Sequence, residues 1–237
     1  MIEITGVTKK YGPKTAVDAV TFTAKPGRVT GFLGPNGAGK SSTLRILLGL
    51  DRATGGTALI DGKPYASIDQ PLRTVGAMLD GASAVPERRG IDHLRWIAQS
   101  NRIPTQRIAE VLETVGLTDA AKIRVRKYSL GMKQRLGLAA ALLGEPRILV
   151  LDEPVNGLDP EGIRTVRTFL RRYADQGNTV LLSSHLMGET AETVDDIVII
   201  NKGRIIADGT LDDITEGHAS LEAAFFVLTG SEPGQSW

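Results

Sequence analysis

The segment from Gly34 to Ser41 restricts the possible folds more than any other part of the chain. Its sequence, GPNGAGKS, has the G-x-x-x-x-G-K-[ST] spacing of a phosphate-binding loop. Apolar residues 29–33 before it predict a buried strand, and residues 42–48 after it predict a helix that ends at Gly49. A strand, a phosphate-binding loop and a helix in this order predict an α/β fold in which the sheet is mostly parallel.

Each residue type in this loop has a physical role in holding phosphates. Glycines allow consecutive backbone N–H groups to point inward and form a nest for an anion. Lys40 adds a positive charge, and the Ser41 hydroxyl is a ligand for Mg²⁺. We expect Lys40 to face solvent, so that its loss would leave the core packing intact. The residues predicted to bind the nucleotide are Gly34, Pro35, Asn36, Gly37, Ala38, Gly39, Lys40, Ser41 and Ser42.

The composition excludes several other kinds of site. The chain has 237 residues, a net charge of +1, no cysteine and three histidines. Disulfides, thiolate metal sites and cysteine nucleophiles are therefore excluded, and a multi-histidine metal site is not expected. The balanced charge gives no sign of a nucleic-acid partner, and we expect none. The N-terminal residues lack the apolar core of a signal peptide and no apolar run reaches the length of a membrane span, which predicts a cytoplasmic protein.

The remaining segments predict a single domain over residues 1–230, with a flexible tail at 231–237. Short β-type segments near the N-terminus predict an antiparallel β subdomain, with a polar turn from Lys9 to Gly12. Helical periodicity after residue 91 predicts an α-helical subdomain inserted at about residues 81–144. Further strands are expected at 75–79, 148–151 and 179–183, a helix at 160–175, a hairpin at 197–207 and a closing helix at 220–229.

Polar residues follow three of these strands: Asp80, the pair Asp152 and Glu153, and His185. Because an open α/β sheet binds its ligands at the carboxyl ends of its strands, we expect these side chains to converge on one γ-phosphate. Asp152 would hold Mg²⁺ together with Ser41, and Asp80 would add a further carboxylate ligand. Glu153 would polarise the attacking water, and His185 would contact the γ-phosphate. The alternatives are a helix cap followed by a solvated acid, a structural histidine, and a turn cap at Asp80.

These motifs together resemble an ATP-binding cassette (ABC) transporter ATPase subunit over about residues 1–215. Residues 34–41 resemble its Walker A motif, and residues 148–152 with Glu153 resemble Walker B and the catalytic glutamate. The sequence YSLGMKQR at 128–135 is similar to the signature motif, and NGLD at 156–159 to the D-loop. His185 matches the switch histidine, and Tyr11 matches the aromatic residue that stacks on adenine.

The resemblance implies ATP and Mg²⁺ as cofactors, within a phosphate-binding NTPase core that carries the β and helical subdomains. It implies a head-to-tail dimer with a second copy of the chain, in which Ser129 and Gly131 touch the γ-phosphate bound by the other protomer. It also implies that Asp159 of the D-loop is a nucleotide-binding residue. A serine and a glycine at a helix N-terminus form an anion site without a lysine, which agrees with this role. It also implies a separate integral membrane permease, with this chain on the inner face of the membrane.

The segment 128–132 and the closing residues 220–230 are similar to the bacterial drug- and antibiotic-export branch. The chain departs from the family pattern at Leu130 and Met132 in the signature motif, and at Asp80, where a glutamine is expected. The leading hypothesis is therefore the energy-supplying subunit of an exporter. A soluble ATPase acting on ribosomes or DNA, and a regulatory cassette that moves no substrate, remain the alternatives.

Overall fold

The structure is a computed structural model that describes residues 1–79 and 84–230. The chain divides into two compact units, one formed by Met1–Ile68 and Leu170–Trp237 and the other by Asp69–Phe169. The boundary falls within helix α6 (Pro160–Asp175). The predicted magnesium ligand Asp80 and the predicted flexible tail at 231–237 lie outside the described residues.

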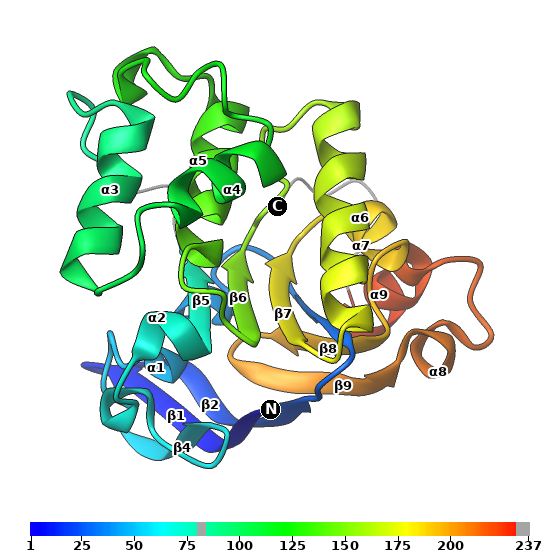
Figure 1. Cartoon of the computed structure of the whole chain (residues 1–237). Coiled ribbons are helices and arrows are strands. Elements are labelled where there is room, and N and C mark those ends of the chain that lie inside the picture. Colours follow the sequence, from blue (N-terminus) through cyan, green and yellow to red (C-terminus); the bar gives the residue numbers. More distant parts are fainter. Residues whose placement is uncertain (80–83, 231–237) are drawn as a thin grey trace. The chain divides into compact units, whose positions relative to one another are not determined.

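The first unit contains an antiparallel sheet in the order β2-β1-β4, formed by β1 (Ile2–Tyr11), β2 (Lys14–Ala24) and β4 (Gly55–Ile60) (Figure 1). Ile2, Ile4 and Val7 of β1 are buried, and the pairing of β1 with β2 shifts in register between Ile4 and Val7. The predicted polar turn at Lys9–Gly12 is wrong, because β1 continues through Tyr11. Residues 10 and 11 pair with residues 15 and 14 of β2, so backbone hydrogen bonding extends the hairpin through this polar segment.

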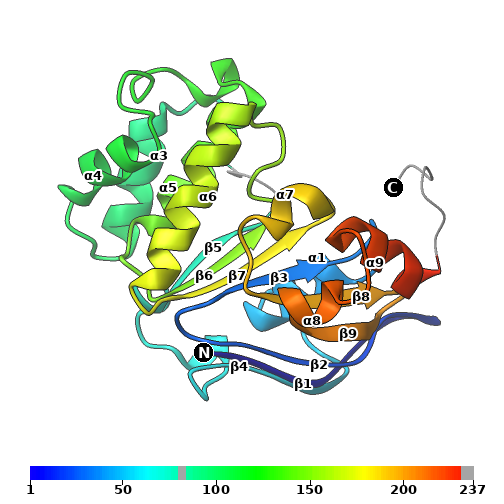
Figure 2. The ribbon, with the colours of Figure 1, turned by 90° about the vertical axis from the view of Figure 1, so that its right-hand side faces the viewer.

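The same unit contains a second, mostly parallel set of strands in the order β7-β3-β8-β9 (Figure 2). β3 (Val29–Leu33) is buried along its whole length and runs parallel to β7 (Thr179–Ser184) and β8 (Asp196–Asn201). β9 (Arg204–Thr210) pairs antiparallel with β8, which confirms the predicted hairpin. The phosphate-loop helix is α1 (Lys40–Leu47), and α9 (Leu221–Thr229) contacts β9. The short helices α7 (Met187–Ala191) and α8 (Leu211–Thr215) were not predicted.

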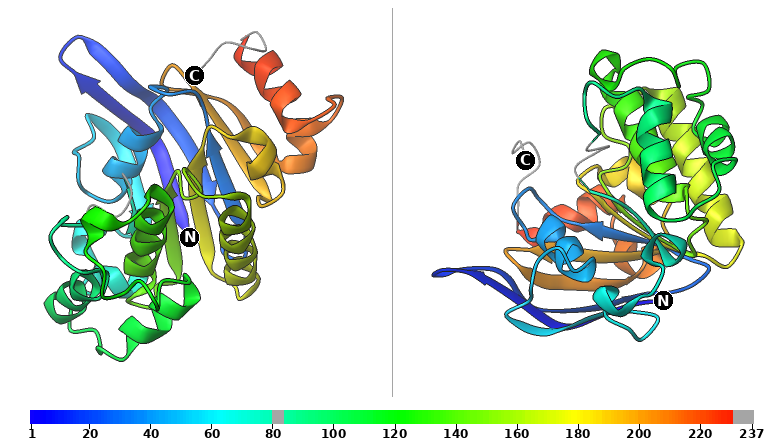
Figure 3. Two further views of the ribbon diagram at one scale, coloured as in Figure 1. Left: turned by 90° about the horizontal axis from the view of Figure 1, so that it is seen from above. Right: turned by 60° about the vertical axis from the view of Figure 1, so that its left-hand side comes forward.

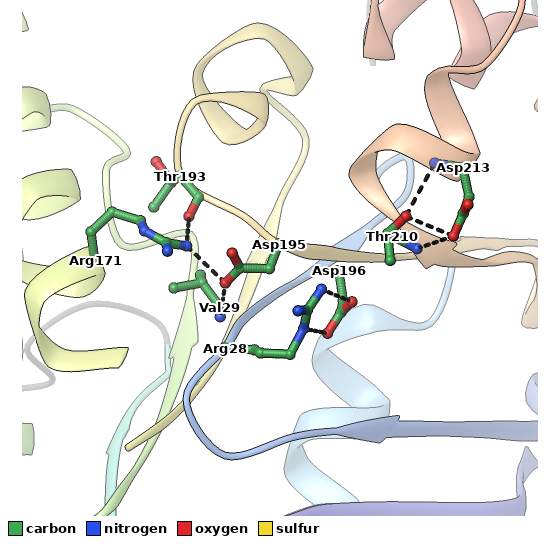
Figure 4. A network of polar contacts seen from close by, with 8 residues as sticks. All are labelled: Arg28, Val29, Arg171, Thr193, Asp195, Asp196, Thr210 and Asp213. Carbon is green, nitrogen blue, oxygen red and sulfur yellow. Dashed lines mark hydrogen bonds and ion pairs between the residues drawn. The ribbon is translucent and has the colours of Figure 1, made fainter. Parts of the chain in front are cut away.

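Ion pairs fix the start of the central strand β3 (Figure 4). The Arg28 guanidinium donates two hydrogen bonds to the Asp196 carboxylate, at 2.5 and 2.6 Å. Asp195 Oδ2 accepts from the Val29 N–H at 2.8 Å and from Arg171 Nη1 at 2.7 Å. These bonds hold β3 against the beginning of β8, and therefore set the register of the strand that leads into the phosphate loop.

The second unit has a parallel strand pair, β5 (Val75–Met78) and β6 (Ile148–Asp152), after the short helix α2 (Pro71–Thr74). Helices α3 (Gly90–Ser100), α4 (Arg107–Thr114) and α5 (Leu130–Leu142) contact one another, and Figure 3 shows them as a cluster. These helices lie within the segment predicted to be helical. Single 3₁₀ turns occur at Tyr65–Ser67 in the first unit and Val125–Lys127 in the second. Within residues 1–79 and 84–230, no helix combines the length and apolar character needed to cross a membrane.

Candidate functional site

The phosphate loop connects β3 to α1 and has the backbone shape that an anion nest requires. Gly37 and Gly39 have φ values of 77° and 114°, a left-handed region that favours glycine. Gly34 is needed for a different reason, since a Cβ there would lie 2.3 Å from the Ile200 carbonyl oxygen of β8. The Ala38 carbonyl oxygen accepts from the Gly203 N–H at 2.9 Å. The loop is therefore held tightly against the end of β8 and the turn that follows it.

Lys40 is buried, with only 6% of its surface exposed, so the expectation that it faces solvent is wrong. Its ammonium group donates to the carbonyl oxygens of Gly34 at 2.6 Å and Pro35 at 3.3 Å. The loop curls around the lysine because these backbone oxygens supply the partners that a buried ammonium group requires. The charge is thus already removed from bulk water and fixed within the loop.

His185 and Tyr11 belong to the same unit as this loop. Ser184 at the end of β7 pairs with Leu33, the residue before Gly34, so the half-buried His185 follows its strand at the same end of the sheet as the loop. Tyr11 ends β1 and is 47% exposed. The structure thus brings His185 beside the beginning of the phosphate loop, whereas its contact with a γ-phosphate stays a prediction.

In the second unit, β6 ends in the predicted acidic pair. Asp152 is the last residue of the strand and is 7% exposed. Glu153 has a φ of 50°, which is uncommon for a residue with a side chain. The Asn156 N–H donates to the Glu153 carbonyl oxygen at 3.2 Å, closing a turn directly after the strand. The strand end and this turn fix the backbone at Glu153, and its catalytic role stays a prediction.

The signature segment begins α5 in the second unit. The exposed Ser129 is the N-cap, and its hydroxyl oxygen accepts from the Met132 N–H at 3.1 Å. Leu130, which replaces the family's glycine, is 57% exposed. A Cβ on Gly157 would lie 2.2 Å from a methyl carbon of Leu130, and one on Gly131 would lie 3.2 Å from the Gly157 carbonyl oxygen. The signature and D-loop segments are therefore packed against each other through their glycines.

Asp159 of the D-loop has a structural contact that the sequence did not indicate. Its Oδ1 accepts from the Gly162 N–H at 2.9 Å in the first turn of α6. This bond satisfies one of the N–H groups at the helix start that lack an internal partner. The position of the D-loop is thereby coupled to the beginning of α6.

The predicted magnesium ligands have suitable chemistry. The Ser41 hydroxyl and the Asp152 carboxylate are oxygen donors, which Mg²⁺ prefers, and each lies in its predicted motif. Among residues 1–79 and 84–230, no group of three acidic or histidine side chains forms a ready-made metal site.

Sequence reasoning missed the residues that surround Tyr11. Asp51 accepts a hydrogen bond from the Tyr11 hydroxyl at 3.3 Å, and Lys9 lies over the ring at 4.9 Å from its centroid. Asp51 belongs to no recognised motif and is 40 residues from Tyr11 in the chain. Only the fold brings the two side chains together.

Comparisons with known proteins agree on one family. The sequence profile of the family described as ABC transporter matches residues 17–156. The bacitracin transport ATP-binding protein BcrA of Bacillus licheniformis is 40% identical over 90% of this chain and 71% of its own length. The lantibiotic transport ATP-binding protein SrtF of Streptococcus pyogenes is 35% identical over 95% of this chain and 96% of its own.

A solved structure shows the same fold. It is the dimeric post-hydrolysis state of the ATP-binding cassette MJ0796 bound to ADP and Pi, with a TM-score of 0.80 and 23% identity. The match covers 89% of this chain and 98% of that one. The predicted α/β architecture, with an N-terminal antiparallel sheet and a mostly parallel sheet, is thereby confirmed.

Proposed function

The chain belongs to the ABC transporter family as an ATP-hydrolysing subunit, and we propose that it powers export of an antibiotic or similar compound by a separate membrane subunit. The observation that carries the proposal is the phosphate loop with Lys40 enclosed by its own carbonyl groups. The similarity to bacitracin and lantibiotic transport ATP-binding proteins supports the class of substrate. The substrate path itself would belong to the membrane subunit.

The first unit would bind ATP. Its inward-facing N–H groups and the start of α1 would hold the phosphates, because an anion is stabilised at the N-terminus of a helix. Lys40 would exchange its loop carbonyl partners for β- and γ-phosphate oxygens, with its charge already desolvated. Tyr11 would stack on the adenine ring, since base–aromatic stacking requires only an exposed ring face.

Hydrolysis would depend on side chains from several of the predicted motifs. Glu153 would accept a proton from the attacking water, and its fixed backbone conformation would orient the carboxylate. His185 would donate a hydrogen bond to the γ-phosphate as charge develops on it. Ser41 and Asp152 would hold Mg²⁺, which when bound would neutralise negative charge on the phosphate oxygens.

Two copies of the chain would form a head-to-tail dimer with ATP between them. The N-terminus of α5 presents an exposed serine and a glycine, and the anion that this site would bind is the γ-phosphate held by the other copy. The D-loop, including Asp159, would lie beside the same phosphate. Binding of ATP would thus bring the copies together, and hydrolysis would allow them to separate.

The inserted segment at about residues 81–127, with its loop at 81–90 nearest, is proposed to dock the cytoplasmic loops of the membrane subunit, which would place the protein on the inner face of the membrane. The chain has no cysteine, so single introduced cysteines can be cross-linked without background. Val85, which is 47% exposed, lies in this segment, whereas Val227, which is 67% exposed, lies on α9. We expect Val85→Cys to cross-link to a co-expressed membrane partner and Val227→Cys to serve as the matched control.

Transport is tested by producing the chain with its membrane partner in a bacterium sensitive to bacitracin or a lantibiotic. The pair should raise the minimal inhibitory concentration, and the pair carrying Glu153→Gln should not. Active ATPase together with unchanged sensitivity to a panel of such compounds would argue against the proposed substrate class. Cross-linking from Val227→Cys alone would argue against the proposed docking surface.

A further inference from the structure

Tyr11 is held by side chains that lie outside every recognised motif. Its hydroxyl donates to Asp51 Oδ2 at 3.3 Å, and Arg45 Nε donates to the same oxygen at 2.9 Å. Tyr11 lies at the end of β1 and is 47% exposed, so about half of its surface is free of protein contacts. The bond to Asp51 restricts the rotation of this partly exposed side chain.

Lys9 covers one side of the Tyr11 ring. Its ammonium group lies 4.9 Å from the ring centroid and donates to the Arg52 carbonyl oxygen at 2.7 Å. A cation in this position is attracted by the ring face, and the backbone bond keeps it there. A nucleobase can consequently stack only on the opposite face of the ring.

These contacts connect the ring to the phosphate loop. Arg45 lies on α1, the helix that begins at Lys40, and its partner Asp51 follows that helix. The hydrogen bond from Arg45, with a smaller one from Tyr11, lowers the pKa of Asp51, so the carboxylate stays ionised and remains an acceptor near neutral pH. The chain of contacts from Arg45 through Asp51 to Tyr11 thus fixes the ring relative to the helix that holds the phosphates.

We propose that Asp51 is a positioning residue for the nucleobase: it holds the Tyr11 ring ready for stacking, Arg45 holds Asp51, and Lys9 closes the opposite face. The inference rests on the proposed contact between Tyr11 and adenine. A ring that is already ordered loses less rotational freedom on binding, which strengthens the affinity for a nucleotide. The affinity for the phosphates alone is unaffected, because neither Asp51 nor Tyr11 belongs to the phosphate loop.

The test measures dissociation constants of Mg·ATP and of inorganic tripolyphosphate with magnesium by calorimetry. The variants are Tyr11→Ala, Tyr11→Phe, Asp51→Ala and the double variant Tyr11→Phe/Asp51→Ala. Tyr11→Phe keeps the ring and removes only the hydroxyl that bonds to Asp51. The matched control is Asp175→Ala, which also removes a surface aspartate paired with an arginine, Arg171 at 3.6 Å.

We expect Tyr11→Ala to weaken ATP binding by about tenfold or more, since stacking on the ring is lost. Asp51→Ala and Tyr11→Phe should each weaken it by about three- to tenfold, and the double variant no further, because both remove the same bond. Tripolyphosphate binding should change by less than about twofold in all variants, and Asp175→Ala should match the wild type.

Two results would overturn the inference while leaving the adenine contact intact. One is ATP binding by Asp51→Ala at wild-type strength when Tyr11→Ala binds weakly. The other is an equal loss of ATP and tripolyphosphate affinity in Asp51→Ala, which would indicate a general structural effect. Wild-type ATP affinity in Tyr11→Ala would instead show that the proposed adenine contact is wrong, and the inference would fall with it.

Discussion

Replacing Gly34 by alanine tests how tightly the phosphate loop is built against β8. The new Cβ would lie 2.3 Å from the Ile200 carbonyl oxygen and 2.9 Å from its Cγ2 atom, so the loop must move by roughly 1 Å to reach normal contact distance. This movement strains the bond from Lys40 to the Gly34 carbonyl oxygen and the bond from Gly203 to Ala38. Overpacking of this kind costs about 1–3 kcal/mol, and each lost hydrogen bond adds about 1 kcal/mol.

The expected total is about 2–5 kcal/mol of unfolding free energy, or a fall in Tm of roughly 10 °C for a chain of this size. A displacement near 1 Å in the binding loop should also reduce kcat by about a hundredfold. The matched control is Gly37→Asn. Gly37 has a φ of 77°, which asparagine tolerates, and a Cβ added there would meet no atom of residues 1–79 and 84–230 within 4 Å.

Thermal unfolding and steady-state ATPase rates measure both effects on the purified full chain. Gly34→Ala should lose stability and activity together, whereas Gly37→Asn should keep its Tm within about 2 °C of wild type. A Gly34→Ala protein with wild-type Tm and ATPase rate would refute the reasoning. Equal losses of Tm in the two variants would show that backbone conformation, and not contact with β8, determines the tolerance of the loop.

Three further predictions concern single side chains. Lys40→Met should weaken ATP binding by about a hundredfold or more, since a unit charge near a phosphate is worth about 4 kcal/mol at an effective dielectric constant of 20. The control is Lys14→Met, which removes an exposed lysine. A loss of ATP affinity below about threefold in Lys40→Met would contradict the prediction. Glu153→Gln should lower kcat by about 10²–10⁴-fold with ATP affinity retained, and should elute as a dimer in size-exclusion chromatography with Mg·ATP. A variant that stays monomeric and hydrolyses ATP at the wild-type rate would exclude Glu153 as the general base. Burial, with a smaller effect of the Arg88 charge, lowers the pKa of His93, so below about pH 6.5 the unfolded chain binds a proton that the folded chain does not. Stability should therefore fall as the pH decreases through this range, and His93→Gln should show a flatter dependence of Tm on pH; equal slopes would refute it.

The elements that carry the chemistry are predictable from the sequence because their signals are local. The strand Val29–Leu33 and the helix Pro160–Asp175 begin and end where apolar runs, proline and glycine predict. Ser129 caps α5 because a serine oxygen readily accepts from the N–H groups at a helix start. Such patterns depend on neighbours a few residues away, so they survive without knowledge of the fold.

Other features depend on residues that are distant in the chain, and only the tertiary structure decides them. Strand pairing extends β1 through Lys10 and Tyr11, although this polar segment before Gly12 is predicted as a turn. The carbonyl groups of the loop enclose Lys40, although a lysine in a glycine-rich loop reads as exposed. Glu153 adopts its unusual backbone conformation because a buried strand and a tight turn meet there.

The partners of Tyr11 show the same division. The sequence identifies Tyr11 as the aromatic residue that matches the adenine-stacking position of the family, because it precedes the phosphate loop in the same order as in the family's motifs. It does not identify Asp51, because an aspartate after a helix is common and its contact with Tyr11 spans 40 residues. The antiparallel pairing of β1 with β4 and the course of α1 bring these two side chains together. The sequence alone thus identifies the chemical groups that belong to recognised motifs, whereas long-range packing decides which further side chains join them and how all of them are oriented and held.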